Sequence, residues 1–165
     1  MNVDAVSRDE YLEVLSWSAR RALPAWRGEL ERWSQGTGFS KLWGYNVPGE
    51  PLRLAGVLAY LRSVGGMGRD ASREALAIVR AYAAVRDGVD RGLVAARAET
   101  REAGGLPLFV NFFFVTLYAE TVGRLRATGD LDAGDVAFLE RELAVAVNLV
   151  FSFPEWGGHN RAIIR

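Results

Sequence analysis

The sequence predicts an all-α protein of antiparallel helical hairpins that form part of an incomplete α/α toroid. Apolar residues recur at helical spacing along most of the chain, and the alternation typical of strands is not found. Short Gly-rich turns separate the helical stretches, and two hairpins of similar length are expected at 51–88 and 107–153. Hairpins that bury one helix of each pair favour a solenoid or a toroid. A helical segment over 1–35 is expected to precede the partial toroid of 36–165 within one compact domain.

Length, composition and charge limit the class of protein. The 165 residues, half of them hydrophobic, suffice for a core and lack the composition of a disordered chain. The chain has no cysteine, which excludes disulfides and thiol chemistry, and with a single histidine a zinc site is not expected. Basic and acidic residues balance at 20 each, so we expect no nucleic-acid partner. No signal peptide is visible, and the most apolar stretch, 106–119, is shorter than the ~20 residues of a membrane span.

The first helix is expected to begin with a capping box, in which Ser7 covers the amide of Glu10 and Glu10 reaches back. Pro24 should end or kink this helix, with a short continuation beyond the proline. The apolar positions that follow the capping box at helical spacing are Tyr11, Leu12, Val14, Leu15 and Ala19.

A second helix is expected from Pro51, a residue that suits the first position of a helix. A turn at 65–68 separates it from a third helix, which either Asp70 or Ser72 is expected to cap. The apolar stripe of the second helix is Leu54, Val57, Leu58, Leu61 and Val64, and the stripe of the third is Ala75, Leu76, Val79, Tyr82, Ala83 and Arg86.

Two more helices are expected in the second half of the chain. The first, over about 107–128, is apolar nearly all round in its first half, which predicts an inner, fully covered helix. A turn at 129–132 follows, and Asp132 with Asp135 is expected to start the last helix, which Pro154 ends. The acidic residues of this turn resemble the start of a calcium loop, but the later ligands are out of register, so capping is the expected role.

The single histidine lies in a loop with several polar neighbours, between Pro154 and the end of the sequence. His159 could transfer protons near neutral pH, Asn160 could donate hydrogen bonds to an anion, and Arg161 could bind a carboxylate through two bonds. The alternative is that Asn160 caps a following helix and Arg161 is solvated. Trp156 belongs to the same loop and is a further candidate for substrate contact.

A second cluster of candidate residues precedes the second helix. Trp43 and Tyr45 could stack on a sugar ring while Asn46 bonds to its hydroxyls, or these aromatic residues, with Phe39, could close the end of a helical core. Asn111, inside the apolar stretch, is either a satisfied buried polar group or part of a pocket.

The order of several motifs resembles one family of enzymes. An aromatic-rich lead at 43–46 enters a helix at Pro51, and a turn and an Ala-rich helix at 72–82 follow. Then come a hydrophobic helix with a Gly-Asp-Leu turn at 112–131 and the stretch Gly-Gly-His-Asn-Arg-Ala at 157–162. Together these segments look like the helical N-terminal domain of the heparinase II/III-like and alginate-lyase superfamily of polysaccharide lyases.

The resemblance covers about 36–165 and implies β-elimination on an acidic polysaccharide, with no cofactor and no metal. It assigns catalytic roles to Asn160, as the group that neutralises the uronate carboxylate, and to His159, which assists it. Substrate contacts would come from Trp43, Tyr45, Asn46, Trp156 and Arg161. Many alginate-type members have Asn before His, whereas this chain has His before Asn, so either side chain could face the cleft.

The resemblance further implies that the family's tyrosine base and a later histidine lie beyond Arg165. The chain is therefore expected to be the N-terminal portion of such a protein and not an active lyase by itself. The alternative is a non-enzymatic helical-repeat module that binds a glycan or a protein. A glycoside hydrolase is disfavoured, because Glu155 is the only acid in the candidate loop and that chemistry needs a carboxylate pair.

Overall fold

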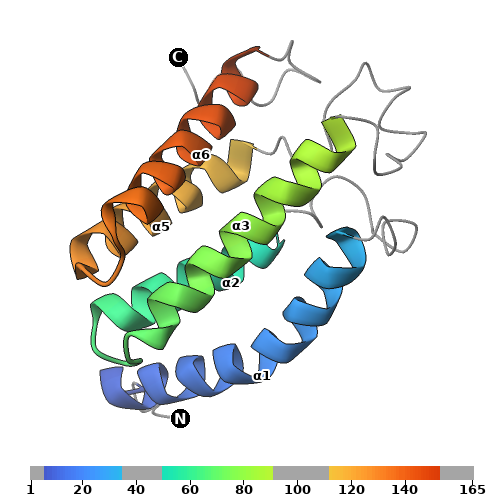
Figure 1. Ribbon diagram of the computed structural model, residues 1–165. Helices are drawn as coiled ribbons and strands as arrows, with labels where there is room; N and C mark the ends of the chain where they lie inside the picture. The colour runs from blue at the N-terminus through green and yellow to red at the C-terminus, as the bar shows by residue number, and fades with distance from the viewer. Residues whose placement is uncertain (1–5, 35–49, 91–111, 153–165) are drawn as a thin grey trace, which may run out of the picture.

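The computed structural model describes residues 6–34, 50–90 and 112–152, and over these ranges the protein is all-α, without a strand (Figure 1). The all-α prediction is therefore confirmed. The helices are α1 (Arg8–Ser34), α2 (Glu50–Ser63), α3 (Asp70–Asp90), α5 (Phe112–Thr128) and α6 (Ala133–Ser152).

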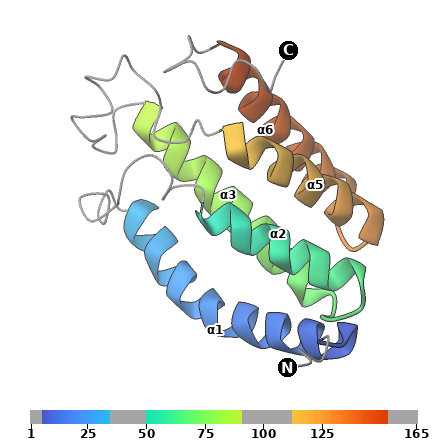
Figure 2. The ribbon, with the colours of Figure 1, turned by 180° about the vertical axis from the view of Figure 1, so that it is seen from behind.

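The helices lie in three layers, with α2 and α3 in the middle (Figures 1 and 2). α1 packs on one side against both of them, while α5 packs on the other side against α2, and α6 packs against α5 and α3. The chain reverses direction at 65–68 between α2 and α3 and again at 129–132 between α5 and α6. Each of these consecutive helix pairs lies side by side.

Among the described residues, those of α2 have the most complete cover. Leu58, Ala59 and Leu61 of α2 have no exposed surface, because α1, α3 and α5 all contact this helix. In contrast, Thr116 and Ala119 of α5 are exposed, so the cover of α5 is incomplete at these two positions. The cover predicted for the first half of this helix stays a prediction, because the side chains of 112–115 lie outside the described ones. That helix begins at Phe112, and the expected residues 107–111 lie outside the described ranges.

Small residues bring α2 and α5 close together. A Cβ atom added at the buried Gly56 of α2 would lie 2.8 Å from Cδ1 of Leu117 and 3.1 Å from Oγ1 of Thr121, both on α5. Thr121 is itself buried, and its hydroxyl donates a hydrogen bond to the Leu117 carbonyl at 2.7 Å. The contact between the middle layer and α5 thus depends on the absence of a side chain at position 56.

The capping box at the start of α1 is present as predicted. The Ser7 amide and hydroxyl donate to the Glu10 carboxylate at 2.8 and 2.7 Å, and the Glu10 amide donates back to the Ser7 hydroxyl at 3.2 Å. Two hydrogen bonds from Ser7 lower the pKa of the Glu10 carboxyl, and the bond from the hydroxyl has a larger effect than the bond from the amide. α1 continues through Pro24, and Figure 1 shows it bent, as expected of a helix with an interior proline.

Only some of the apolar residues of α1 face the protein. Ala19 is buried, and Leu12 and Leu15 are half-buried against the core. Tyr11 and Val14, which lie in the same apolar run, have 53% and 62% of their surface exposed. The run covers one broad arc of about 160° on the helix, and only the part of this arc with Leu12, Leu15 and Ala19 faces the core.

The turn between α2 and α3 ends α2 with a glycine in the left-handed conformation, Gly65 at φ 80°. The Gly66 amide donates to the Leu61 carbonyl at 2.8 Å, and the Gly65 amide donates to the Arg62 carbonyl at 3.3 Å. This pair of bonds is a Schellman motif, which satisfies carbonyls at the end of the helix. The turn predicted at 65–68 is confirmed.

The start of α3 differs from the prediction, since neither Asp70 nor Ser72 caps the helix. The Ala71 and Ser72 amides donate to the carbonyls of Gly68 and Arg69 at 3.0 and 3.1 Å. The Ser72 hydroxyl is turned toward Asp130, and Asp70 is exposed beside Arg73. The predicted stripe of α3 is buried at its first five positions, Ala75, Leu76, Val79, Tyr82 and Ala83, and Arg86 lies outside the described side chains.

The start of α6 agrees with the prediction. Oδ1 of Asp132 accepts a hydrogen bond from the Asp135 amide at 2.8 Å, which is the geometry of an N-cap. On α6, Leu139 is buried, and Val136, Leu143 and Val147 are half-buried. Pro154, expected to end this helix, lies outside the described residues.

Candidate functional site

All residues that were predicted from the sequence to take part in catalysis or substrate binding lie outside the described ranges. The structure therefore neither brings them together nor separates them. They are Trp43, Tyr45, Asn46, Trp156, His159, Asn160 and Arg161. The same holds for Phe39 and Asn111.

The helix ends that adjoin these residues share one end of the molecule. Segment 35–49 connects the end of α1 to the start of α2, and segment 153–165 follows the end of α6. In Figures 1 and 2 these three helix ends lie at the same end of the helical layers. The turns at 65–68 and 129–132 lie at the opposite end.

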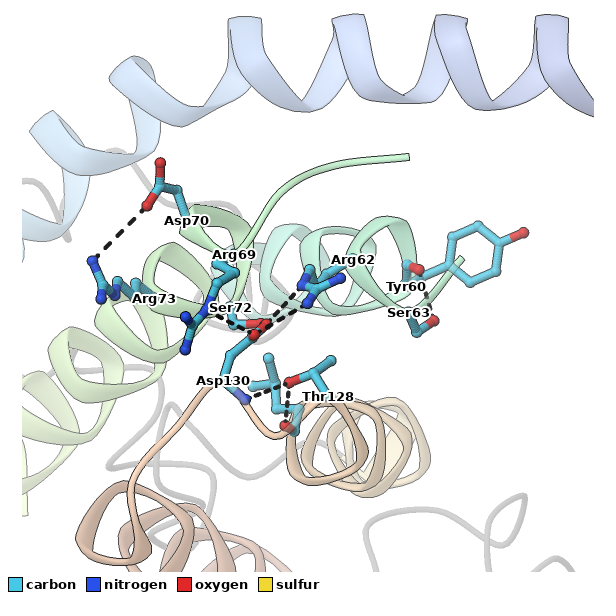
Figure 3. A network of polar contacts seen from close by, with 10 residues as sticks. Tyr60, Arg62, Ser63, Arg69, Asp70, Ser72, Arg73, Thr128 and Asp130 are labelled. Carbon is cyan, nitrogen blue, oxygen red and sulfur yellow. Dashed lines mark hydrogen bonds and ion pairs between the residues drawn. The ribbon is translucent and has the colours of Figure 1, made fainter. Parts of the chain in front are cut away.

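At the end with the short turns, the structure contains a polar cluster that the sequence did not predict (Figure 3). Its centre is Asp130, in the turn between α5 and α6. Arg62, in the last turn of α2, donates to both carboxylate oxygens, from Nε to Oδ2 at 2.7 Å and from Nη2 to Oδ1 at 3.1 Å. Arg69 donates from Nε to Oδ1 at 3.2 Å, and the Ser72 hydroxyl donates to Oδ2 at 2.8 Å. We call Asp130, Arg62, Arg69 and Ser72 the Asp130 cluster.

The Asp130 carboxylate is held in its charged form. Hydrogen bonds from Arg62 are the main reason that the pKa of Asp130 lies far below its usual range, and Ser72 and the charge of Arg69 act in the same direction. Burial opposes this shift, since only 5% of the Asp130 side chain is exposed. The same pairing raises the pKa of Arg62. Both groups are consequently ionised at neutral pH.

The geometry of the Asp130 cluster indicates a structural role. Each carboxylate oxygen already accepts two hydrogen bonds, so the group is poorly suited to remove a proton from a substrate or to bind a metal ion. The cluster instead joins the turn between α2 and α3 to the turn between α5 and α6. No local pattern reveals it, because Asp130 is separated from Arg62, Arg69 and Ser72 by 68, 61 and 58 residues.

Other polar contacts also link neighbouring helices. Arg27 of α1 pairs with Glu74 of α3, and Arg80 of α3 pairs with Asp135 of α6 at 2.5 Å. Arg124 of α5 donates to the Ser63 hydroxyl at 3.0 Å and lies over the ring of Tyr60, both on α2. These arginines are partly or largely exposed, so such pairs contribute little stability individually.

The described residues contain neither a metal-binding group of side chains nor a helix that could span a membrane. Among the described residues, no three or more His, Cys, Asp or Glu side chains are grouped so that they could hold a metal ion. No helix in the described part of the chain has the length and apolar character needed to cross a membrane.

Comparison with known proteins gives no neighbour for this chain. No protein-family model matches it, and no match was found among curated proteins or among solved structures.

Proposed function

We propose that this chain is the N-terminal helical portion of a polysaccharide lyase-like protein that acts by β-elimination on a uronic-acid-containing polysaccharide. The sequence basis is the ordered set of motifs over 36–165, above all Gly157 to Ala162. One structural observation supports it: the helices adjoining segments 35–49 and 153–165 end at the same end of the molecule (Figures 1 and 2). On this proposal, side chains from the two segments contact a common substrate.

We also propose that the pairs α2–α3 and α5–α6 are successive hairpins of an α/α toroid. Both pairs have a short turn at the same end of the molecule and longer connections at the other end. Repeated helix pairs of this kind place their longer connecting loops on the same rim of the toroid. Loops held by rigid helices commonly carry functional groups. The Asp130 cluster would fix the relative position of the two pairs at the rim opposite the substrate.

In the proposed reaction, hydrogen bonds from Asn160 neutralise the carboxylate of the uronate, and His159 assists. This neutralisation lowers the pKa of the proton on C5, because the negative charge that develops as the proton leaves is stabilised. A base removes the C5 proton, and the electrons of the C5–H bond form a double bond between C4 and C5. The bond from C4 to the glycosidic oxygen breaks, and an acid protonates that oxygen. Arg161 and Trp156 would contact a neighbouring sugar, and Trp43, Tyr45 and Asn46 would line a subsite.

The zero net charge of the chain is compatible with an acidic glycan. A basic surface is needed to bind a polyanion along its length, whereas one arginine and one amide suffice to hold a single carboxylate. In this resemblance, no residue of the chain corresponds to the family's tyrosine base. We therefore expect these 165 residues to bind the polysaccharide without cleaving it.

Binding of a short oligouronate tests the proposal. We expect the chain to bind it, and Arg161→Ala to weaken binding about tenfold, equivalent to ~1.4 kcal/mol, through the loss of a charged hydrogen bond. Arg141→Ala, which changes an exposed residue of α6, is the matched control and should leave affinity unchanged. Calorimetric titration with acidic and neutral oligosaccharides of equal length measures both effects.

Equal binding of the acidic and neutral sugars, unaffected by Arg161→Ala, would favour the non-enzymatic binding module. Absence of binding to any sugar would contradict the carbohydrate site altogether. Release of unsaturated uronate by this chain would contradict the expectation that it binds without cleaving.

A further inference from the structure

The outer side of α1 carries exposed apolar side chains. Tyr11, Val14 and Trp17 have 53%, 62% and 58% of their surface exposed. At 3.6 residues per turn they lie within about 120° of one another, with Val14 and Trp17 on the side of the helix away from Ala19 and Tyr11 about 80° from Ala19. In Figures 1 and 2, α1 forms one outer layer by itself, with α2 and α3 on one side of it only.

Two charged residues lie on the same arc, one toward each end. Glu10 is one turn before Val14, and Arg21 is one turn after Trp17. We call Glu10, Tyr11, Val14, Trp17 and Arg21 the outer face of α1. The face is therefore acidic at its N-terminal end, apolar in the middle and basic at its C-terminal end.

This order of charges is complementary to the same order on a second copy of α1 that runs in the opposite direction. Glu10 and Arg21 lie equally far from a point between Leu15 and Ser16, and so do Val14 and Trp17. In an antiparallel pair of α1 helices centred on that point, Glu10 of each helix faces Arg21 of the other. Val14 of each helix then faces Trp17 of the other. A two-fold axis makes such an interface isologous, so that every contact occurs twice.

Contacts within one chain already hold parts of this face in position. The guanidinium of Arg21 lies over the ring of Trp17, 4.9 Å from its centroid. The Glu10 carboxylate is fixed by the hydroxyl and amide of Ser7. Such ordering before association reduces the entropy lost on binding.

We propose that the outer face of α1 binds the same face of a second copy of this chain, antiparallel across a two-fold axis. The inference does not depend on the proposed lyase function. A single pair of crossed helices buries less than the ~1,000 Å² typical of a stable interface. The dimer is accordingly weak, with a dissociation constant of roughly 10 µM to 1 mM, and its affinity falls as salt screens the two charge pairs.

Sedimentation equilibrium of the 165-residue chain over a range of concentrations tests this interface. The variants exchange the charges at positions 10 and 21. We expect wild type to dimerise, and Arg21→Glu and Glu10→Arg each to weaken self-association at least tenfold, because like charges then face one another. Mixing the two variants restores a dimer, since each new charge now faces its opposite in the other chain. Trp17→Ala, which leaves both charges, should also weaken association at least tenfold.

The matched control is Arg141→Glu, which makes the same charge change on the exposed surface of α6 and should leave dimerisation unchanged. Circular dichroism verifies that Glu10→Arg, which also removes the capping box, remains helical; if it does not, Arg21→Glu and Trp17→Ala alone test the interface. A wild-type chain that stays monomeric to millimolar concentration overturns the proposal and assigns the face to another occupant. A dimer that is insensitive to Arg21→Glu and Trp17→Ala overturns it as well.

Discussion

Replacing Leu58 with alanine is expected to destabilise the chain by about 2–5 kcal/mol, the largest effect of a single truncation that we anticipate. Leu58 lies in α2, has no exposed surface and belongs to the core of the protein. Because α2 is covered by three neighbouring helices, the surroundings have little freedom to collapse into the space that the side chain leaves. Urea denaturation followed by circular dichroism measures the change in the free energy of unfolding.

The matched control for this change is Val14→Ala. Val14 is also an aliphatic residue of a helix, but its side chain is largely exposed on α1. We expect its replacement to change the free energy of unfolding by less than about 0.5 kcal/mol when the protein is dilute. If the two substitutions had similar effects, α2 would not be the central helix of the core.

Replacing Asp130 with asparagine is expected to lower the melting temperature by roughly 5–10 °C. The substitution leaves Arg62 and Arg69 without their shared counter-charge at a site where only 5% of the Asp130 side chain is exposed. It also places an amide group, which donates hydrogen bonds, where two arginines and Ser72 already donate. The turns at 65–68 and 129–132 would then be held together less firmly.

Asp132→Asn is the control for Asp130→Asn, two residues away. Asp132 is exposed and accepts one hydrogen bond, from the Asp135 amide, as the N-cap of α6. Asparagine is about as good an N-cap as aspartate, so the melting temperature should change little. Equal losses from the two substitutions would show that the turn as a whole, rather than the Asp130 cluster, determines the effect.

The effect of Asp130 should depend on pH in a defined direction. Its pKa is lower in the folded chain than the ordinary value of 3.8, so the unfolded chain binds more protons between the two values. The stabilisation is thus present in full well above pH 3.8 and is lost as the pH falls below it. The difference in melting temperature between wild type and Asp130→Asn should therefore narrow on acidification, and a constant difference would contradict this assignment.

Features set by neighbouring residues were predictable from the sequence. The capping box of Ser7 and Glu10, the turn at Gly65 and the N-cap Asp132 each depend on hydrogen bonds between residues at most five positions apart. The stripe of α3 was also predictable, because one apolar arc on a helix has one possible buried side.

Features that depend on packing between distant segments were not predictable. α1 has an apolar arc that is broader than the part that meets the protein, and periodicity alone does not tell which part is buried. Ser72 suits an N-cap by type, but its hydroxyl bonds to Asp130, which is 58 residues away. The cover of α2 likewise comes from three helices that are brought together only by the fold. The candidate residues of the proposed substrate site lie outside the described ranges, and their roles stay predictions.

We propose that segments 35–49 and 153–165 contribute to one oligouronate site. Because the chain has no cysteine, Val47→Cys and Ala162→Cys together provide a unique pair of positions for spin labels next to, but not among, the proposed contact residues. Pulsed electron resonance then measures the distance between the two labels. The 20 residues of α6 span ~30 Å, which is the separation expected of segments at opposite ends of the helices. We expect the mean distance between the labels to be well below ~30 Å. We also expect the width of the distance distribution to decrease when an oligouronate is added. A distance of ~30 Å or more, unchanged by the oligouronate, would contradict it.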